Sequence, residues 1–347
     1  MKKYLFALLT ILSLSISAKN IGMDISYGSF LDDKGNGYIE VYFAISGSSL
    51  DLKQHPDGNY TGGVEITLTV TKDSTTYVIA DKFRIISPPI TDTSNIPATL
   101  VQQQRYAISQ GEYNLGIEIK DINEESEHYS FSNDLIFDLD SVSVSTSKLM
   151  FLDHFEKTTD NDPFAKNGFK LVPVVSSQSY YFNQGVKELP FYIELYNLDE
   201  KLGPEQPYVI KYYIENQGHI LERYTGFSKK MSAPVQPFLA KLNIADLPSG
   251  NYTMVIEAVD KENNNILKTT QFFYRQNNTS NVTMEDFTSD EVNGSWVATL
   301  GEADSLYTFI EYLFPISTET EQNYQQKLLA DPDIEKMRQY FYVFWYS

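Results

Sequence analysis

The chain has 347 residues, no cysteine and a formal net charge of −19, with 46 acidic against 27 basic side chains. The negative charge argues against nucleic acid as a partner and against adhesion to an anionic membrane surface, since both need clustered lysine and arginine. The lack of cysteine excludes disulfides, thiolate metal sites and a lipid-bearing cysteine, and an aromatic content of 14% favours strands, whose pleated faces accept rings.

The first 18 residues have the composition of a secretory signal peptide. Lys2 and Lys3 precede an apolar run at residues 4–14, and small residues follow up to Ala18. The run is too short to span a bilayer comfortably, and the alternative is a buried first strand or helix. We therefore expect export to the periplasm or the outer-membrane-associated cell envelope of a Gram-negative bacterium, with no transmembrane span after signal cleavage.

Residues 20–140 are predicted to form a first β-sandwich. The segment 32–37 predicts a turn and not a calcium loop, because Lys34 and Phe43 stand where that loop needs an oxygen ligand and a glutamate. Two prolines at 88–89 end a strand, and the polar stretch 90–104 predicts a loop or a short helix. The predicted strands are 38–45, 64–70, 77–80, 83–86, the strand after Gly111, and 129–137.

Residues 149–275 are predicted to form a second β-sandwich, after a connector at 138–147 that is a linker or a first strand. Pro173 confines its strand to a sheet edge, and residues 216–219 predict a hairpin turn. The predicted strands are 171–176, 179–182, 189–196, 208–215, 220–227, 238–244, the strand after Gly250, and 266–274. Seven or eight strands are typical of an immunoglobulin-like sandwich.

Two stretches of the chain, 108–121 and 247–260, read almost alike. In each, a glycine precedes a tyrosine by two positions, and an Ile-Glu-x-x-Asp tail follows. The glycine permits a turn with positive φ, and the tyrosine can turn its ring into the core as a tyrosine corner. The predicted corner residues are Gly111 with Tyr113, and Gly250 with Tyr252.

A second pair of similar sequence segments supports tandem repeats. Residues 38–42, Tyr-Ile-Glu-Val-Tyr, are similar to residues 192–196, Tyr-Ile-Glu-Leu-Tyr. In each half this strand comes early and the glycine–tyrosine strand comes late, as expected of two tandem sandwiches.

The polar stretch 276–283 predicts a linker, and residues 284–347 predict a helical segment, because the apolar period changes from two to 3.6. Pro315 ends a first helix, Thr318 with Glu321 forms a capping box, and Asp331 caps a third helix. The apolar stripe of the first helix is Leu306, Phe309, Ile310 and Leu313.

The third helix ends in a run of aromatic residues, a composition that marks an interaction site. Two alternatives explain the run: the helix docks on a protein partner, or a missing C-terminal domain covers it. The candidate interaction surface is Met337, Tyr340, Phe341, Phe344 and Trp345.

Residues 310–316, Ile-Glu-Tyr-Leu-Phe-Pro-Ile, and residues 338–345, Arg-Gln-Tyr-Phe-Tyr-Val-Phe-Trp, carry a family resemblance. They resemble the helices that lead into the signature domain of the GWxTD-domain proteins of Bacteroidota. The resemblance implies a signal peptide, a β-rich N-terminal half and a following domain. The Gly-Trp-x-Thr-Asp signature is not present in this chain, and the resemblance implies no catalytic residues.

No catalytic, cofactor or metal site is predicted. The four histidines show no metal-ligand spacing, and no phosphate loop, nucleophile elbow or zinc-protease motif occurs. A three-residue pattern similar to the O-glycosylation signal of Bacteroidota occurs at Ser74, Ser141 and Ser305.

The sequence therefore predicts a non-catalytic envelope protein whose tandem sandwiches serve as a scaffold or protein-interaction module, for example within an envelope or outer-membrane assembly. The alternative is a secreted glycan-binding protein, or the accessory region of a carbohydrate-active or proteolytic enzyme.

Overall fold

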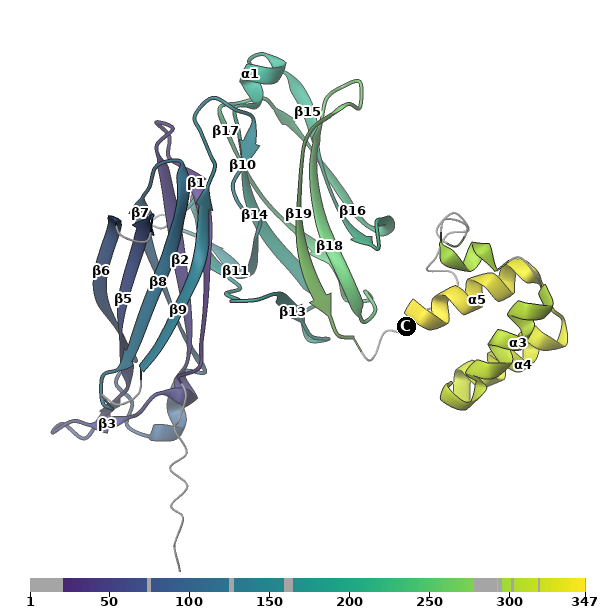
Figure 1. Cartoon of the computed structure of the whole chain (residues 1–347), viewed down its shortest axis with the longest axis horizontal. Coiled ribbons are helices and arrows are strands. Elements are labelled where there is room, and N and C mark those ends of the chain that lie inside the picture. Colours follow the sequence, from purple (N-terminus) through teal and green to yellow (C-terminus); the bar gives the residue numbers. More distant parts are fainter. Residues whose placement is uncertain are drawn as a thin grey trace, which may run out of the picture. The chain divides into compact units, whose positions relative to one another are not determined.

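The computed structural model describes residues 21–73, 76–124, 128–158, 165–277, 292, 295–300, 303–317 and 319–346. The predicted signal peptide lies outside this part of the chain. The chain divides into two compact units. The first contains the residues up to Tyr27 together with Tyr38–Asp138. The second contains Gly28–Gly37 together with the residues from Leu139 onward. Strands dominate both units, and short helices follow near the C-terminal end (Figure 1). The predicted fold class, tandem β-sandwiches followed by a helical segment, is confirmed.

The first sandwich combines a three-stranded and a four-stranded sheet. The three-stranded sheet has the order β1-β2-β7, with β1 (Met23–Leu31), β2 (Gly37–Ser46) and β7 (Thr99–Ala107). The four-stranded sheet has the order β6-β5-β8-β9, with β5 (Gly63–Lys72), β6 (Thr76–Ile86), β8 (Gly111–Asp121) and β9 (His128–Phe137). The short elements are η1 (Gly47–Ser49), β3 (Lys53–Gln54), β4 (Tyr60–Thr61) and η2 (Thr93–Asn95).

The period-two alternation of the sequence decides which strand faces are buried. Along β8, Tyr113, Leu115 and Ile117 are buried, and the residues between them are partly or fully exposed. The strand β5 alternates in the same way from Val64 to Val70. Each such side chain contributes about 1.5–3 kcal/mol when it leaves water, so the alternation fixes the inner face of the sheet.

The strand β7 corrects one prediction. The sequence predicts a loop or a short helix at 90–104. The short 3₁₀ helix η2 lies there, but the stretch also contains most of β7, which pairs antiparallel with β2. Leu100 lies opposite Ile45 and is buried, whereas Gln103 lies opposite Tyr42. Three consecutive glutamines hide the alternation, and pairing with β2 overrides their weak intrinsic preference for strands.

Predicted turns agree with the structure at three places. The Oδ1 atom of Asp32 accepts hydrogen bonds from the backbone N–H groups of Lys34 and Asn36, both at 2.8 Å, which forms a turn between β1 and β2. The strand β6 ends at Ile86, before the two prolines. Gln217 and Gly218 both have positive φ, as a two-residue hairpin turn requires.

The second sandwich contains two five-stranded sheets. One has the order β10-β14-β11-β12, with β17 also pairing with β14; its strands are β10 (Ser145–Thr146), β11 (Met150–Lys157), β12 (Phe169–Pro173), β14 (Glu188–Tyr196) and β17 (Val235–Asn243). The other has the order β13-β19-β18-β15-β16, with β13 (Tyr180–Phe182), β15 (Pro207–Asn216), β16 (His219–Met231), β18 (Gly250–Val259) and β19 (Asn265–Arg275). The helix α1 (Leu198–Leu202) follows β14, and Pro173 lies on the edge strand β12, as predicted.

The two halves place their glycine–tyrosine strands at equivalent positions. The strand β8 lies between β5 and β9, and β18 lies between β15 and β19, with antiparallel pairing on both sides. The Tyr-x-Glu-x-Tyr strands β2 and β14 are also equivalent, because each pairs with the strand that precedes the glycine–tyrosine strand, β7 or β17. Each of the two pairs of similar sequence segments therefore lies on equivalent strands of the two sandwiches.

The helical segment contains η4 (Trp296–Thr299), α3 (Ala303–Leu313), η5 (Phe314–Ile316), α4 (Glu319–Ala330) and α5 (Ile334–Tyr346). Leu306, Ile310 and Leu313 of α3 are buried in its core. The cap of α5 corrects a prediction: Asp333, not Asp331, precedes the helix, and its Oδ1 accepts from the N–H of Lys336 at 3.0 Å. Thr318 of the predicted capping box and residues 278–283 of the predicted linker lie outside the described residues.

Candidate functional site

The predicted interaction surface at the end of α5 is largely wrong. Met337, Tyr340 and Phe341 are buried in the core of the helical segment, where the apolar faces of α3 and α4 also pack. Phe344 is partly buried against the same core, and Trp345 remains 55% exposed. The 3.6-residue pattern identifies the apolar face of α5, and the chain itself covers most of that face.

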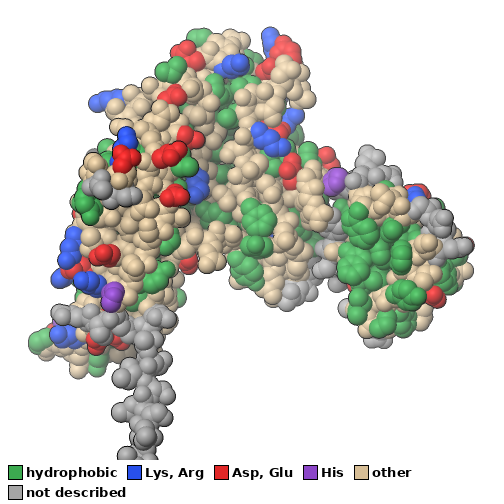
Figure 2. Space-filling view, viewed as in Figure 1, with side chains coloured by type: hydrophobic (Ala, Val, Ile, Leu, Met, Phe, Trp, Pro, Cys, Tyr) green, Lys and Arg blue, Asp and Glu red, His purple; other side chains and the backbone are tan. Residues whose placement is uncertain are grey.

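An exposed aromatic patch nevertheless lies on this segment. We define the aromatic patch as Trp296, Phe309, Phe341 and Trp345. The ring of Phe341 lies 5.8 Å from that of Trp296, 6.1 Å from Phe309 and 6.3 Å from Trp345, centroid to centroid. Trp296 is 49% exposed and Phe309 is 38% exposed, and Figure 2 shows hydrophobic side chains gathered on the helical segment. Phe341 thus forms a buried base with three rings exposed around it.

A cavity of about 410 Å³ lies on the same segment, between α3 with η5 on one side and α4 on the other. Tyr307, Glu311 and Phe314 line one wall, and Gln325 and Leu329 line the other. We call it the α3–α4 cavity. Its size is within the range of small-molecule and side-chain pockets.

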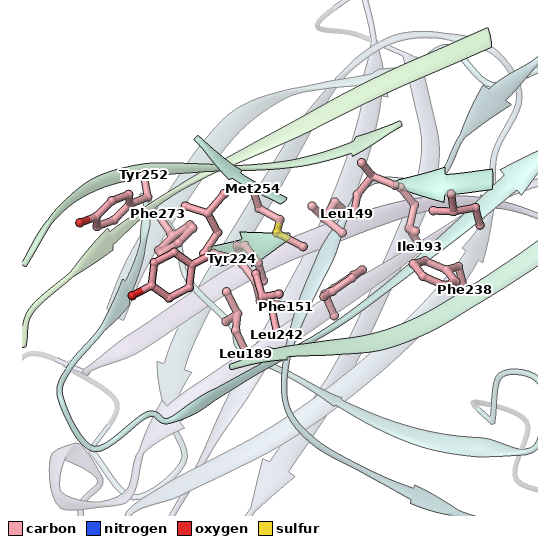
Figure 3. Close-up of a cluster of buried hydrophobic side chains, with 14 of the residues drawn as sticks. Leu149, Phe151, Leu189, Ile193, Tyr224, Phe238, Leu242, Tyr252, Met254 and Phe273 are labelled. Atoms are coloured by element: carbon pink, nitrogen blue, oxygen red, sulfur yellow. The ribbon is translucent and has the colours of Figure 1, made fainter. Parts of the chain in front are cut away.

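The two predicted tyrosine corners have the same geometry. The hydroxyl of Tyr113 donates to the backbone carbonyl of Ser109 at 2.9 Å, and the hydroxyl of Tyr252 donates to that of Pro248 at 3.2 Å. Both rings are buried, and Figure 3 shows Tyr252 beside Phe273 at one end of the second core. Each hydroxyl therefore satisfies a carbonyl four residues upstream while its ring fills the core.

The prediction of a positive φ holds for Gly111, at +157°, but not for the glycine of the second corner. Gly250 does not have positive φ, so a left-handed turn is not the shared reason for glycine. A Cβ at Gly111 or at Gly250 would lie 3.1 Å from the hydroxyl oxygen of the tyrosine two residues later. The glycine leaves room for the ring to fold back over the backbone.

A buried glutamate, Glu194, lies near the C-terminal end of β14, on the face opposite the core. The carboxylate of Glu194 accepts hydrogen bonds from the hydroxyls of Tyr192 and Tyr196, both at 2.7 Å, and lies 3.4 Å from Nζ of Lys166. Lys166 also lies 3.5 Å from the centroid of the Phe30 ring, within the same unit. All four polar groups are buried, so the carboxylate and the ammonium compensate each other away from water.

The first sandwich repeats this arrangement on β2. Tyr42 donates a short hydrogen bond to Glu40, and Nε of Arg105 donates to the same carboxylate at 2.9 Å. Burial, and then the negative charge of Glu40, raise the pKa of Tyr42 well above its ordinary value of 10.0, so its hydroxyl stays a donor. The guanidinium of Arg105 also lies 4.8 Å from the ring centroid of Tyr38.

The strands β2 and β14 could be predicted from the sequence, but the buried polar clusters around Glu40 and Glu194 could not. The Tyr-x-Glu-x-Tyr spacing places all three side chains on one strand face, which is the signal that could have revealed them. The cations come from distant parts of the chain: Arg105 lies 65 residues from Glu40, and Lys166 lies 28 residues from Glu194. No local pattern connects such residues.

The hydroxyl of Tyr208 is buried and unsatisfied within the described part of the chain. Tyr208 on β15 is buried, its hydroxyl has no hydrogen-bond partner among the described residues, and burial raises its pKa above the ordinary value of 10.0. Because the folded-state pKa is the higher one, this group contributes no pH dependence of stability well below pH 10, and stability falls as the pH rises further because the unfolded chain ionises first. We expect Tyr208→Phe to raise the free energy of unfolding by about 1 kcal/mol at pH 7 and to flatten its decline above pH 10. Urea titrations of both proteins from pH 7 to 11 measure this, and a less stable variant would contradict it.

Exposed rings also gather on the outer face of the second sandwich. Phe272 and Tyr274 of β19 lie 4.8 Å apart, centroid to centroid, and both are more than one-third exposed. Tyr181 of β13 lies in register beside Tyr274 and is also exposed. Asn251, on the neighbouring strand, lies opposite Tyr274.

The predicted modification sites differ in setting. Ser141 is exposed in a turn, where Asp140 Oδ1 accepts from the N–H of Val142 at 2.8 Å. Ser305 is partly buried in the first turn of α3, and Ser74 lies outside the described residues. Within the described parts of the chain, no group of three or more histidine, aspartate or glutamate side chains could hold a metal ion. No helix among these residues is long and apolar enough to cross a membrane.

No family model and no curated protein matches the chain. Solved structures match it at low identity. Fibronectin(III)-like modules of Clostridium thermocellum CbhA match at 9% identity over 71% of this chain and 89% of theirs, with a TM-score of 0.19. A glycosyl hydrolase family 2 member from Bacteroides cellulosilyticus matches at 10% over 69% of this chain and 26% of its own, with a TM-score of 0.22. CBD12 from CALX1.2 matches at 11% over 78% of this chain and 85% of its own, with a TM-score of 0.17.

These scores are too low to carry any argument about function. The topology described above is what shows the sandwich fold, and the resemblance to GWxTD-domain proteins stays a prediction.

Proposed function

We propose that the chain is a non-catalytic scaffold protein of the cell envelope, exported by its first 18 residues, and that its helical segment binds a protein partner. The two sandwiches would serve as spacers that hold this segment. The aromatic patch carries the proposal, because Trp296 and Trp345 are 49% and 55% exposed beside the buried base of Phe341. Tryptophan and phenylalanine are enriched at the centres of protein interfaces.

The chemistry of the patch favours a protein surface as the occupant. Its exposed rings are adjacent, and a contiguous exposed apolar surface of this kind marks an interaction site. The formal charge of −19 makes an anionic membrane a poor competitor for it. The GWxTD resemblance belongs to the same proposal, since it implies a further domain next to these helices.

Affinity capture from envelope extract tests this proposal. We expect the Trp296→Ala/Trp345→Ala double variant to bind the captured partner at least about 100-fold more weakly, because a central tryptophan typically contributes 2 kcal/mol or more. The matched control is Phe227→Ala on β16, where the ring is 72% exposed but lies outside the helical segment. Capture that survives the double variant and fails with Phe227→Ala would contradict the proposal.

The exposed rings on β13 and β19 favour a second candidate, glycan binding by the second sandwich. Aromatic faces stack on the apolar faces of sugars, and the amide of Asn251 opposite Tyr274 could bind a hydroxyl. Isothermal titration with a polysaccharide panel tests it: binding that Tyr274→Ala abolishes, and that Tyr129→Ala on β9 of the first sandwich leaves unchanged, would favour this candidate.

A further inference from the structure

The strand β9 forms an open edge of the first sandwich. It pairs with β8 on one side, and no other described strand pairs with it. Near its C-terminal end, the hydroxyl oxygen of Tyr27 accepts a hydrogen bond from the backbone N–H of Ile136, which therefore points away from β8. Backbone groups of successive strand residues point alternately to the two sides. The N–H and C=O groups that also point away from β8 are thus those of residues 128, 130, 132 and 134.

The strand β9 also lacks the features that commonly keep an edge strand from pairing with another chain, which are lysine, proline and β-bulges. The opposite edge of the same sheet, β6, carries Lys82 and Arg84, and its register with β5 shifts next to Thr71. The sequence of β9 contains no lysine, arginine or proline, and its register with β8 runs without a shift from His128 to Phe137. The edge is therefore regular and open to another strand.

The equivalent strand of the second sandwich accepts an added strand along this edge. The pairing of β18 with β19 matches that of β8 with β9, and β13 lies parallel to the last three residues of β19, Phe273–Arg275. The remainder of β19 carries Lys268. In the first sandwich the side chain of Tyr27 occupies the corresponding place at Ile136, so the open part of the edge is residues 128–134.

We propose that two copies of the chain associate by antiparallel pairing of residues 128–134 of β9, which joins their four-stranded sheets. The open edge is symmetric about Phe131, so a two-fold axis at that residue brings each outward N–H and C=O group opposite one of the other copy. Phe131 is partly buried and then faces its counterpart, a favourable cross-strand aromatic pair. His128 faces Asp134 of the partner copy at both ends, so no acid faces an acid in a chain with a net charge of −19.

The outward groups and the charges select this register over its neighbours. Moving the axis to Ser132 would require the N–H of Ile136, which already donates to Tyr27. Moving it to Asp134 would place two aspartates opposite each other, and like charges directly opposite are destabilising. The axis at Phe131 avoids both problems.

Sedimentation equilibrium of the full chain tests the proposal. We expect a monomer–dimer equilibrium with a Kd on the order of 10 μM, because one short strand from each copy makes an interface below the standard size. Ser130→Pro removes one outward N–H from each copy, and edge strands tolerate proline at such positions. This variant should dimerise at least about tenfold more weakly, with the urea-unfolding midpoint of the native chain.

A charge exchange tests the register without changing the backbone. His128→Asp places an aspartate opposite Asp134 of the partner copy at both ends and should weaken dimerisation about tenfold. The double variant His128→Asp/Asp134→Lys places a lysine opposite each new aspartate and should restore dimerisation. The matched control is Ala80→Asp, which adds one negative charge at an exposed position of β6 and should leave the Kd unchanged.

Three results would overturn the proposal. One is a chain that stays monomeric at about ten times the expected Kd. Another is a dimer that Trp296→Ala/Trp345→Ala abolishes and His128→Asp leaves unchanged, because the contact would then belong to the aromatic patch. The third is a double variant that dimerises as weakly as His128→Asp, because the two residues would then not face each other. The proposed function does not depend on these outcomes, since it rests on the helical segment.

Discussion

Replacing Glu194 by alanine is expected to lower the free energy of unfolding of the second sandwich by about 3–5 kcal/mol. The buried ammonium of Lys166, 3.4 Å from the carboxylate, would lose the charge that offsets its own. The hydroxyls of Tyr192 and Tyr196 would lose an acceptor at 2.7 Å. Together these losses leave polar groups in a site from which water is excluded, and such groups are costly when uncompensated. Urea unfolding of the native and variant chains measures the effect.

A matched control distinguishes the stability effect of a buried ion pair from that of an exposed one. Lys241 and Glu188 form an ion pair at 2.7 Å at the other end of β14, with both side chains about half exposed. Glu188→Ala should cost no more than about 1 kcal/mol, because water replaces an exposed partner. A Glu194→Ala cost no larger than that of Glu188→Ala would contradict the role of the buried cluster.

Tyr252→Ala should destabilise the second sandwich by about 3–5 kcal/mol, the range for removing a buried aromatic ring. The ring packs 5.7 Å from that of Phe273, centroid to centroid, and its hydroxyl satisfies the carbonyl of Pro248. Tyr252→Phe keeps the ring and loses the hydrogen bond, so it should cost only about 1 kcal/mol. The difference between the two variants, measured by urea unfolding, separates packing from the hydrogen bond.

The control for this series is Tyr274→Ala on the adjacent strand β19. Tyr274 is 41% exposed on the opposite sheet face, so we expect a cost of about 0.5 kcal/mol. A Tyr252→Ala variant as stable as Tyr274→Ala would show that the ring does not fill the core.

Most of the strands could be predicted because the alternation of apolar and polar residues that identifies a strand lies within the strand's own sequence. Alternation along residues 64–70 and 113–119 places one row of side chains in the core, whatever the rest of the chain does. The strand β7 escaped prediction because its stabilising partner is β2, more than fifty residues upstream, and its own sequence is polar. The α5 cap was misplaced because two aspartates, at 331 and 333, both precede the helix, and only the folded backbone selects Asp333.

The candidate site was less accessible to sequence reasoning. The aromatic run of α5 is visible in the sequence, but only packing shows that α3 and η4 contact the buried Phe341 and that Trp345 stays exposed. Trp296 joins the patch from 45 residues before Phe341, and no periodicity of the sequence links η4 to α5. The α3–α4 cavity depends on the placement of three elements, which no single window of sequence contains.

The equivalence of the two tyrosine corners is tested most directly by the rate at which their two hydroxyl protons exchange with water. NMR of the full chain with labelled tyrosines can measure how fast the hydroxyl protons of Tyr113 and Tyr252 exchange with water. Since both donate to backbone carbonyls and both rings are buried, we predict slow exchange for the two of them. Rapid exchange at either residue would contradict the repeated-sandwich account.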